Sequence, residues 1–316
     1  MVEAIRYFSD PDTCLEFMVS LRWPDGVTCP QCNSKEVTFL KNARLWKCRT
    51  KHRRQKFSIK VGTIFEDSPI SLDKWLAAVW MIANCKNGVS SYEIHREIGV
   101  TQKTAWFMLH RIRLAMQTGT FANFSGQVEA DETFIGGLAR NMHKDKRKEK
   151  IEGGGPVGKT IVMGLLERHG PKDAPKTSKV KAMIVPNTGG GTLQRRVRWH
   201  VEPGSEVFTD ANRSYEGLKF DYAHKVIDHA EAYVKGNVHT NGIENFWSLL
   251  KRTVKGTYVS VEPFHLFRYL DEQSFRFNSR KDNNAGRFED VLRTITGRRL
   301  TYSKLTGKES GDGLSV

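Results

Sequence analysis

Three acidic residues that lie far apart in the chain are the first candidates for chemistry: Asp131, Asp210 and Glu244. Carboxylate oxygens are preferred ligands of hard divalent cations such as Mg2+. When a phosphodiester is cut, two such ions about 4 Å apart activate the attacking oxygen and stabilise the leaving oxygen. If two strands and one helix bring these carboxylates together, the sequence predicts a two-metal site for phosphodiester cleavage.

Two of these carboxylates lie in segments that are typical of strands. Asp131 is in VEADETFIGG, where strand alternation predicts Glu129 and Asp131 on one face and Glu132 on the other. Asp210 ends the apolar run EVFTD, and ligands of open sheets bind at the carboxyl ends of strands. Taken alone, each has a simpler interpretation: an exposed hairpin around Asp131, and a helix N-cap at Asp210.

The stretch HTNGIENFWSLLKR predicts an amphipathic helix. Its core-seeking face holds Ile243, Phe246, Trp247, Leu250 and Val254. The opposite face holds Glu244, Ser248, Lys251 and Lys255, which step by four, three and four residues. On the functional interpretation this line faces metal and DNA, with Lys251 beside the phosphates. The alternative is a capping box between Asn241 and Glu244 on a solvated face.

A cysteine cluster near the N-terminus predicts a structural zinc site. Cys29 and Cys32 lie two residues apart on a CPQC turn, and Cys48 is followed by His52 at C-x3-H spacing. Two such pairs complete a tetrahedral Zn2+ site. The segment around them is poor in aliphatic residues, so the metal would supply folding energy. The remaining cysteines, Cys14 and Cys85, are expected to be core thiols.

Residues 71–116 show helical periodicity and predict a helix-turn-helix. The pattern predicts a helix over 72–85, a second helix capped by Ser90 or Ser91, a turn at Gly99, and a third helix capped by Thr101. Side chains at the start of the third helix would reach base edges, and nearby arginines would contact phosphates. The residues expected to contact DNA here are Gln102, Lys103 and Thr104 at the helix start, with Arg96, Arg111 and Arg113 for the phosphates. The alternative is an ordinary helical hairpin.

The charge of the chain favours a polyanionic partner. The 316 residues carry a net charge of +15 and a sequence pI of about 9.6, which is typical of nucleic-acid-binding proteins. Residues 41–60 contain nine Lys or Arg and no acid, and Arg140–Lys150 contains six basic residues and two acidic ones. No apolar run is long enough for a membrane span, and the first residues, MVEAIRYFSDPD, lack the apolar region expected of a secretory signal. We therefore expect a cytoplasmic protein that acts on nucleoid DNA.

The rest of the chain predicts a multidomain α+β or α/β architecture. Three successive strands from Gln127, followed by alternating helices and strands, indicate a mixed sheet with helices on its faces. The expected domains are a helical lead-in (1–25), a zinc ribbon (26–66), a helix-turn-helix region (67–120), a catalytic domain (121–280) and a basic C-terminal tail (281–316).

The combined order of motifs resembles insertion-sequence DDE transposases of the ISXO type, which have a zinc-ribbon N-terminus. The resemblance covers about residues 10 to 280 and rests on CPQC, FSIKVGTIFEDSPI, TAWFMLHRIR, VEADETFIGG, VFTDANRSYEGL and HTNGIENFWSLLKRTVKGTY. It implies an RNase H-like catalytic domain that depends on Mg2+ or Mn2+. It also implies Asp131, Asp210 and Glu244 as the catalytic metal ligands.

The same resemblance bears on the start of the helix that carries Glu244. The spacing from Glu244 to Lys251 is similar to that of related transposases. In part of the family an asparagine is the third catalytic residue, so Asn241 remains an alternative to Glu244. If Glu244 is the ligand, His239 and Asn241 are expected to support it or to contact DNA.

The activity implied by the resemblance is DNA transposition in two steps. Water attacks a phosphodiester at the end of the element and frees a 3′-hydroxyl, which then attacks target DNA. The ribbon and helix-turn-helix would bind double-stranded DNA at terminal inverted repeats, and paired ends imply a homodimer or a higher assembly. Two other hypotheses are a non-catalytic DNA-binding regulator derived from a transposase, and an RNase H-type nuclease without strand transfer.

Overall fold

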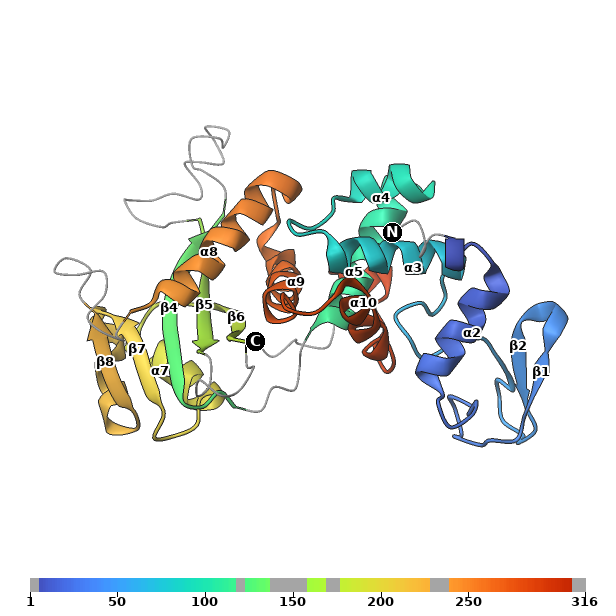
Figure 1. Cartoon of the computed structure of the whole chain (residues 1–316), viewed down its shortest axis with the longest axis horizontal. Helices are drawn as coiled ribbons and strands as arrows, with labels where there is room; N and C mark the ends of the chain where they lie inside the picture. The colour runs from blue at the N-terminus through green and yellow to red at the C-terminus, as the bar shows by residue number, and fades with distance from the viewer. Residues whose placement is uncertain (1–5, 118–122, 137–157, 169–176, 228–238, 309–316) are drawn as a thin grey trace. The chain divides into compact units, whose positions relative to one another are not determined.

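The computed structural model describes residues 6–117, 123–136, 158–168, 177–227 and 239–308 (Figure 1). The chain divides into two compact units: unit 1 is residues 1–116 with 282–314, and unit 2 is residues 117–281 with 315–316. The basic cluster at 140–150 lies outside the described residues. Among those described, no helix combines the length and apolar character that crossing a membrane requires.

Unit 1 combines a small antiparallel sheet with helices. The sheet has the order β1-β2-β3. The elements are α2 (Pro11–Arg22), β1 (Val37–Leu40), β2 (Leu45–Cys48), β3 (Lys56–Phe57), α3 (Leu72–Asn84), α4 (Ser91–Ile98), α5 (Gln102–Met116), α10 (Asn284–Arg293) and α11 (Tyr302–Leu305), with a short 3-10 turn at Lys41–Ala43. The small sheet lies in the predicted ribbon, and α3 to α5 occupy the predicted helical segment.

The helical boundaries of the predicted helix-turn-helix are confirmed, and local capping explains them. Ser90 is the N-cap of α4 and forms a reciprocal capping box with Glu93. Gly99 ends α4 in the left-handed conformation, with φ of 61°, where a residue without Cβ is favoured. The hydroxyl of Thr101 accepts the backbone N–H of Thr104 and so caps the start of α5.

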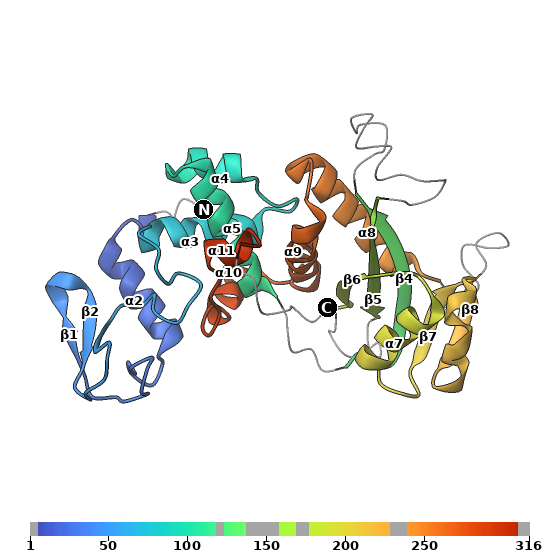
Figure 2. The same ribbon diagram turned by 180° about the vertical axis from the view of Figure 1, so that it is seen from behind.

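The C-terminal segment differs from the expected basic tail, because it folds as part of unit 1. Phe288 of α10 is buried and lies against the rings of Phe8, Phe17 and Trp80. Figure 2 shows α10 and α11 beside α5, and the ring of Tyr302 in α11 contacts the α5 start. The local sequence pattern did not predict these helices, because their apolar residues pack on segments that are far away in the chain.

Unit 2 is built on a five-stranded mixed sheet with the order β6-β5-β4-β7-β8. The β4–β5 and β5–β6 pairs are antiparallel, and the β4–β7 and β7–β8 pairs are parallel. The elements are β4 (Gln127–Ile135), β5 (Thr160–Glu167), β6 (Lys179–Val185), α7 (Gly190–His200), β7 (Glu206–Asp210), β8 (Ala223–Ile227), α8 (Asn241–Thr253) and α9 (Leu266–Asn278), with short 3-10 and π turns at Arg213–Phe220, Val254–Tyr258 and Pro263–His265. The predicted mixed sheet is confirmed.

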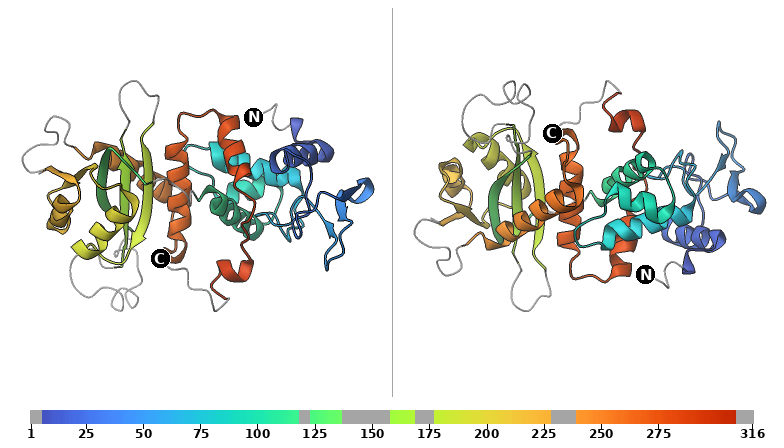
Figure 3. Two further views of the ribbon diagram at one scale, coloured as in Figure 1. Left: turned by 90° about the horizontal axis from the view of Figure 1, so that it is seen from below. Right: turned by 90° about the horizontal axis from the view of Figure 1, so that it is seen from above.

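Helices cover both faces of this sheet and bury a core on each side. Figure 3 shows α8 and α9 on one side of the sheet and α7 on the other. The α7 side packs apolar residues of the helix, such as Leu193 and Val197, on Val128 and Val207. On the other side, apolar residues of α8 such as Ile243 and Phe246 pack on apolar residues of β5 and β6. The alternating sides of β4 therefore face two different helical layers.

We predict that Phe288→Ala destabilises unit 1, although this residue lies near the end of the chain. Its side chain is 3% exposed and joins three segments through ring contacts, so truncation leaves a cavity. The free energy of unfolding should fall by about 3–5 kcal/mol, measured by urea denaturation. Tyr92→Ala is the control, because Tyr92 of the same unit is 62% exposed. An equal effect of the two substitutions would contradict the packing described for α10.

Candidate functional site

The parallel pairing of β4 and β7 brings two of the candidate carboxylates together. Val128 pairs with Val207 and Glu129 with Phe208. Continued by two residues, this register sets Asp131 beside Asp210 at the carboxyl end of β7. Side chains at paired positions of neighbouring strands point to the same face. Two residues separated by a long stretch of chain thus share one face of the sheet.

The face is the one covered by α8. The backbone N–H of Ile243 in α8 donates to Glu129 Oε2 at 2.8 Å, and the indole N–H of Trp247 donates to Asp131 Oδ2 at 2.9 Å. Glu132 points the other way and accepts the hydroxyl of Tyr215. The predicted alternation of β4 is confirmed, and the exposed-hairpin alternative is wrong because β4 is the central strand and Glu129 is buried.

The pKa of Asp131 reports the convergence of the three carboxylates. Burial raises the pKa of this carboxyl to about 6, while the N–H groups of Glu132 and Trp247 act to lower it. The charges of Asp210 and Glu244 raise it further. Asp210 is the neighbour of Asp131 across the β4–β7 pair, and Glu244 lies in the first turn of the helix whose Trp247 binds Asp131. The oxygen atoms of these three carboxylates are less tightly grouped than the donor atoms of the cysteine cluster described below. Within the described ranges, that cluster is the one group of potential metal ligands whose donor atoms all lie close together.

Trp247 serves both the core and Asp131. Its indole is 4% exposed and lies on Gly164 of β5, where an added Cβ would come within 2.6 Å of the ring. The absence of a side chain at Gly164 therefore allows the helix to approach the sheet. The sequence places Trp247 on the core-seeking side of the helix; it gives no sign of the hydrogen bond to Asp131.

Glu132 and Tyr215 join β4 to the segment after β7 on the opposite face. Tyr215 is fully buried and follows Asp210 by five residues. Burial raises the pKa of Glu132 to about 7, the Tyr215 hydroxyl lowers it, and the charges of Asp131 and Asp210 raise it. This link holds the chain just beyond Asp210 against the strand that carries Asp131.

The capping roles suggested for Asp210 and for Asn241 with Glu244 are wrong, although Glu244 does lie on an exposed helix face. Asn212, rather than Asp210, is the N-cap of the following turn. Thr240, rather than Asn241, is the N-cap of α8, and its hydroxyl donates to Glu244 Oε1 at 2.8 Å. The buried carboxylate of Glu129 takes the place of a local capping side chain.

The expected polar line on α8 is confirmed as a solvent-facing surface. Glu244, Ser248, Lys251 and Lys255 are exposed, and Ile243, Phe246, Trp247 and Leu250 are buried. Lys255 lies in the π turn that follows α8. Asn241 is exposed at the first residue of the helix, whereas the His239 ring accepts from Arg168 at 3.0 Å. His239 is thus oriented by the protein, and Lys251 is open to a ligand.

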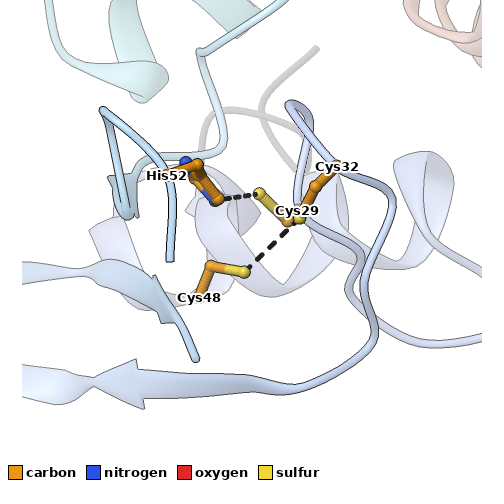
Figure 4. Close-up of side chains that lie close together, drawn as sticks. All are labelled: Cys29, Cys32, Cys48 and His52. Carbon is orange, nitrogen blue, oxygen red and sulfur yellow. Dashed lines mark hydrogen bonds between the residues drawn. The ribbon is translucent and has the colours of Figure 1, made fainter. Parts of the chain in front are cut away.

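The predicted zinc ligands come together in unit 1. One donor atom from each of Cys29, Cys32, Cys48 and His52 lies within 4.8 Å of the others (Figure 4). Cys29 Sγ is 3.3 Å from His52 Nε2, and Cys32 Sγ is 3.6 Å from Cys48 Sγ. Three sulfurs and one imidazole nitrogen suit tetrahedral Zn2+. Burial raises the pKa of the Cys29 thiol, but the N–H groups of Gln31 and Cys32 together with the thiols of Cys32 and Cys48 lower it below its ordinary value, which favours the thiolate that binds metal.

The residues expected at the start of α5 differ in how they are placed. Lys103 is exposed and lies over the ring of Tyr302, with its Nζ 4.8 Å from the ring centroid. Gln102 donates to the Ser91 hydroxyl at 2.9 Å, and the hydroxyls of Thr104 and Thr101 are 2.8 Å apart. Of this set, Lys103 is the side chain most available to DNA.

Arg111 corrects a prediction from the sequence. Its side chain is 4% exposed, donates to the backbone carbonyl of Glu66 and stacks near the ring of Trp75. A buried guanidinium in this position supports the fold and cannot reach a phosphate. Arg113 is buried in the same way, at 1% exposure. Arg96 of α4, by contrast, is exposed, and so are eight of the nine basic residues of 41–60, all but Lys60.

Comparison with known families identifies the class of protein that these features define. Residues 9–52 match a transposase zinc-ribbon domain, and residues 123–278 match an ISXO2-like transposase domain. The chain belongs to the ISXO2-like family of DDE transposases.

Two relatives agree with this assignment. The chain is similar to an uncharacterized protein in transposable element ISH50 of Halobacterium salinarum, with 25% identity over 78% of this chain and 84% of the relative. It is also similar to an uncharacterized transposase-like protein of Haemophilus influenzae, with 35% identity over 32% of this chain and 82% of the relative. The cysteine cluster lies in the matched ribbon domain, which supports a structural zinc ion.

Several residues around the carboxylates escaped the sequence-based prediction. Glu129 and Arg168 form a buried ion pair, and Tyr215 binds Glu132. The available signal for Glu129 was its place in the strand, two residues before Asp131 on the same predicted face. Its partners come from other strands and from a helix, so the sequence did not indicate them.

We predict that Cys48→Ser removes the bound zinc and weakens unit 1. Loss of one thiolate opens a site whose metal supplies folding energy. The zinc content of the purified protein, measured by metal analysis, should fall from about one ion per chain to nearly none, and the thermal midpoint of unfolding should fall with it. Cys85→Ser is the matched control, because Cys85 is outside the cluster. Full zinc content in Cys48→Ser would contradict the ligand assignment.

We predict a pH-dependent difference in stability between the wild type and Glu132→Gln. The pKa of Glu132 rises from 4.5 to about 7 on folding, so the folded state holds a proton that the unfolded state has lost. The wild-type free energy of unfolding should therefore fall relative to the variant, on the order of 2 kcal/mol after solvent screening, as pH rises from about 4.5 to 7. Chemical denaturation of metal-free protein measures it. A constant difference over this range would show that Glu132 titrates normally.

Proposed function

We propose that this protein is an active DNA transposase that cuts DNA at the ends of its element and joins the freed 3′-hydroxyl to target DNA. The observation that carries the proposal is the β4–β7 register, which sets Asp131 and Asp210 on one face of the sheet, under the helix α8 that carries Glu244 and binds Asp131 through Trp247. A DNA-binding regulator has no need for three mutually repelling carboxylates around a half-buried position, since like charges there cost stability.

The donor set around Asp131 suits divalent cations. Asp131, Asp210 and Glu244 supply oxygen ligands, and positive charge at this point would offset their mutual repulsion. We assign these three residues as the ligands of Mg2+ or Mn2+. Bound there, the ions would supply Lewis-acid activation of the attacking and leaving oxygens in both steps. Asn241 remains the alternative third ligand, and Glu244 is favoured because its charge acts on Asp131.

The other residues of the site would bind and orient DNA. The exposed ammonium of Lys251 lies on the same helix face as Glu244 and would pair with a phosphate. Trp247 holds the carboxylate of Asp131 through its indole N–H. In unit 1, Lys103 and the exposed cations of the ribbon would contact double-stranded DNA at the element ends. Pairing two ends requires a homodimer or a higher assembly.

We predict that Asp210→Ala abolishes DNA cleavage and leaves binding to the element ends intact. Loss of a metal ligand should reduce the rate by more than the roughly 10- to 100-fold expected for an outer-sphere partner. Cleavage is measured with Mg2+ on DNA that carries the inverted repeats flanking the coding region, and binding by gel shift. Asp221→Ala is the control, because Asp221 is an exposed residue of the same unit that pairs with Arg198.

The same assay separates the competing functions and ligands. End binding without cleavage by the wild type would favour the regulator, and cleavage without joining would favour a nuclease. Unchanged cutting by Asp210→Ala would remove Asp210 from the site. Glu244→Gln should lose more activity than Asn241→Ala, and the reverse order would make Asn241 the third ligand.

A further inference from the structure

We propose that Glu129 is a positioning residue that sets the first turn of α8, and with it the third metal ligand, relative to the two aspartates. This inference rests on the proposed function, because it concerns the same site. Glu129 lies two residues before Asp131 on the same face of β4. Glu129 is therefore close in the chain to Asp131, and through its contact with Ile243 it is next to Glu244 on the helix.

Glu129 is an unusual residue for the centre of a sheet. Its side chain is 1% exposed, and its Oε1 is 2.7 Å from Arg168 Nε. Burying a carboxylate and a guanidinium costs solvation energy, and an apolar pair of similar size is often as stable. Stability alone is therefore a weak reason for this pair at this place. The contacts of the pair indicate what it does instead.

The carboxylate of Glu129 caps the amino end of α8 from the strand below. Its Oε2 accepts the backbone N–H of Ile243, the third residue of the helix, at 2.8 Å. A helix begins with unpaired N–H groups and a partial positive charge, and a carboxylate satisfies both. The Thr240 side chain at the N-cap position accepts no capping hydrogen bond from a backbone N–H of the helix. The position of this helix end is therefore set by the sheet.

Gly242 permits this close approach. A Cβ at Gly242 would lie 2.9 Å from Glu129 Oε2 and 3.1 Å from Leu166 Cδ2. Any larger residue would push the helix end away from β4. The glycine between Asn241 and Ile243 thus marks the point at which the strand and the helix meet.

Arg168 extends the same contact to the residues before α8. Its guanidinium donates to His239 Nδ1 at 3.0 Å and to the His239 carbonyl, and it lies 4.1 Å from the ring centroid of Phe208. Phe208 is the register partner of Glu129 on β7. One ion pair therefore joins β4, the end of β5, β7 and the segment that leads into α8.

The geometric consequence concerns Glu244. This residue lies in the first turn of α8, one residue after the amide that Glu129 binds. Asp131 lies two residues from Glu129 along a rigid central strand. A shift of the helix end would change the distance between Glu244 and Asp131, whereas the pairing of Asp131 with Asp210 would remain. Loss of Glu129 should therefore raise the Mg2+ concentration needed for cleavage and leave DNA binding unchanged.

The test uses the full chain and measures end binding, cleavage rate and the Mg2+ concentration for half-maximal cleavage. Glu129→Gln keeps the shape of the side chain and removes its charge. We expect end binding to be unchanged, the half-maximal Mg2+ concentration to rise, and cleavage at limiting Mg2+ to fall by roughly 10- to 100-fold. Glu206→Gln is the matched control, because Glu206 is a carboxylate of the same sheet that accepts hydrogen bonds from Gln127 and Lys225.

A second variant separates positioning from stability. In Glu129→Met with Arg168→Met, no unpaired charge remains buried, so the thermal midpoint should stay near that of the wild type. The first turn of α8 nevertheless loses its contact with the sheet. We expect this variant to show the raised Mg2+ requirement despite normal stability. A purely structural ion pair would instead give normal stability and a normal Mg2+ requirement.

Wild-type activity distinguishes the failure of this inference from the failure of the proposed function. If the wild type binds ends and does not cleave, the proposed function falls, and the role of Glu129 falls with it. If the wild type cleaves, and both variants match the wild type in cleavage rate and in Mg2+ requirement, only the positioning role of Glu129 is overturned.

Discussion

The parallel pairing of β4 with β7 is the constraint on which the candidate site depends. Hydrogen bonding between these strands fixes the register and so decides that Asp131 and Asp210 are neighbours. A slip of one residue would turn one aspartate to the opposite face of the sheet. Both strands lie between helical layers. A slip would turn their apolar side chains away from the core and bring polar side chains into it, which would destabilise the fold. The core therefore protects the register, and the register places the carboxylates.

The three acidic residues of β4 have different roles because each one has different neighbours. Glu129 is paired with Arg168 and caps α8, Asp131 is held by Trp247, and Glu132 accepts Tyr215 from the other face. Burial without full pairing is unfavourable, as the raised pKa of Asp131 and Glu132 indicates. Such locally unfavourable groups are characteristic of functional sites, where the rest of the fold compensates for them.

The helix α8 is docked on the sheet at two points separated by one turn. Its amino end is bound through Ile243, and its middle is seated by the Trp247 indole on Gly164. Both points are on the buried side, so the exposed side is free to present Glu244 and Lys251 in a fixed orientation. Unit 2, which contains this arrangement, is joined to unit 1 at both of its ends, because the chain returns to unit 1 after residue 281.

Local patterns predicted much of what the structure contains. The capped helices of unit 1, the cysteine and histidine spacing, the strands of unit 2 and the two faces of α8 follow from periodicity, turn residues and ligand spacing. These signals act over a few residues, which is why the sequence carries them openly. The same signals failed for α10, whose Phe288 contacts Phe8 near the N-terminus, and for α11, whose Tyr302 contacts Phe107 of α5. They also failed for Arg111, whose charge suggested DNA although its side chain is buried.

The sequence by itself determined which residues can bind metal and which segments form helices and strands. Only the tertiary structure decided that Asp131 and Asp210 are strand neighbours, that α8 starts after Thr240, and that Glu129 caps the helix end. The physical reason is the range of the interactions. Helix and turn preferences are local, whereas strand register, burial of a charge and the partner of a buried carboxylate are set by groups that meet only when the chain is folded.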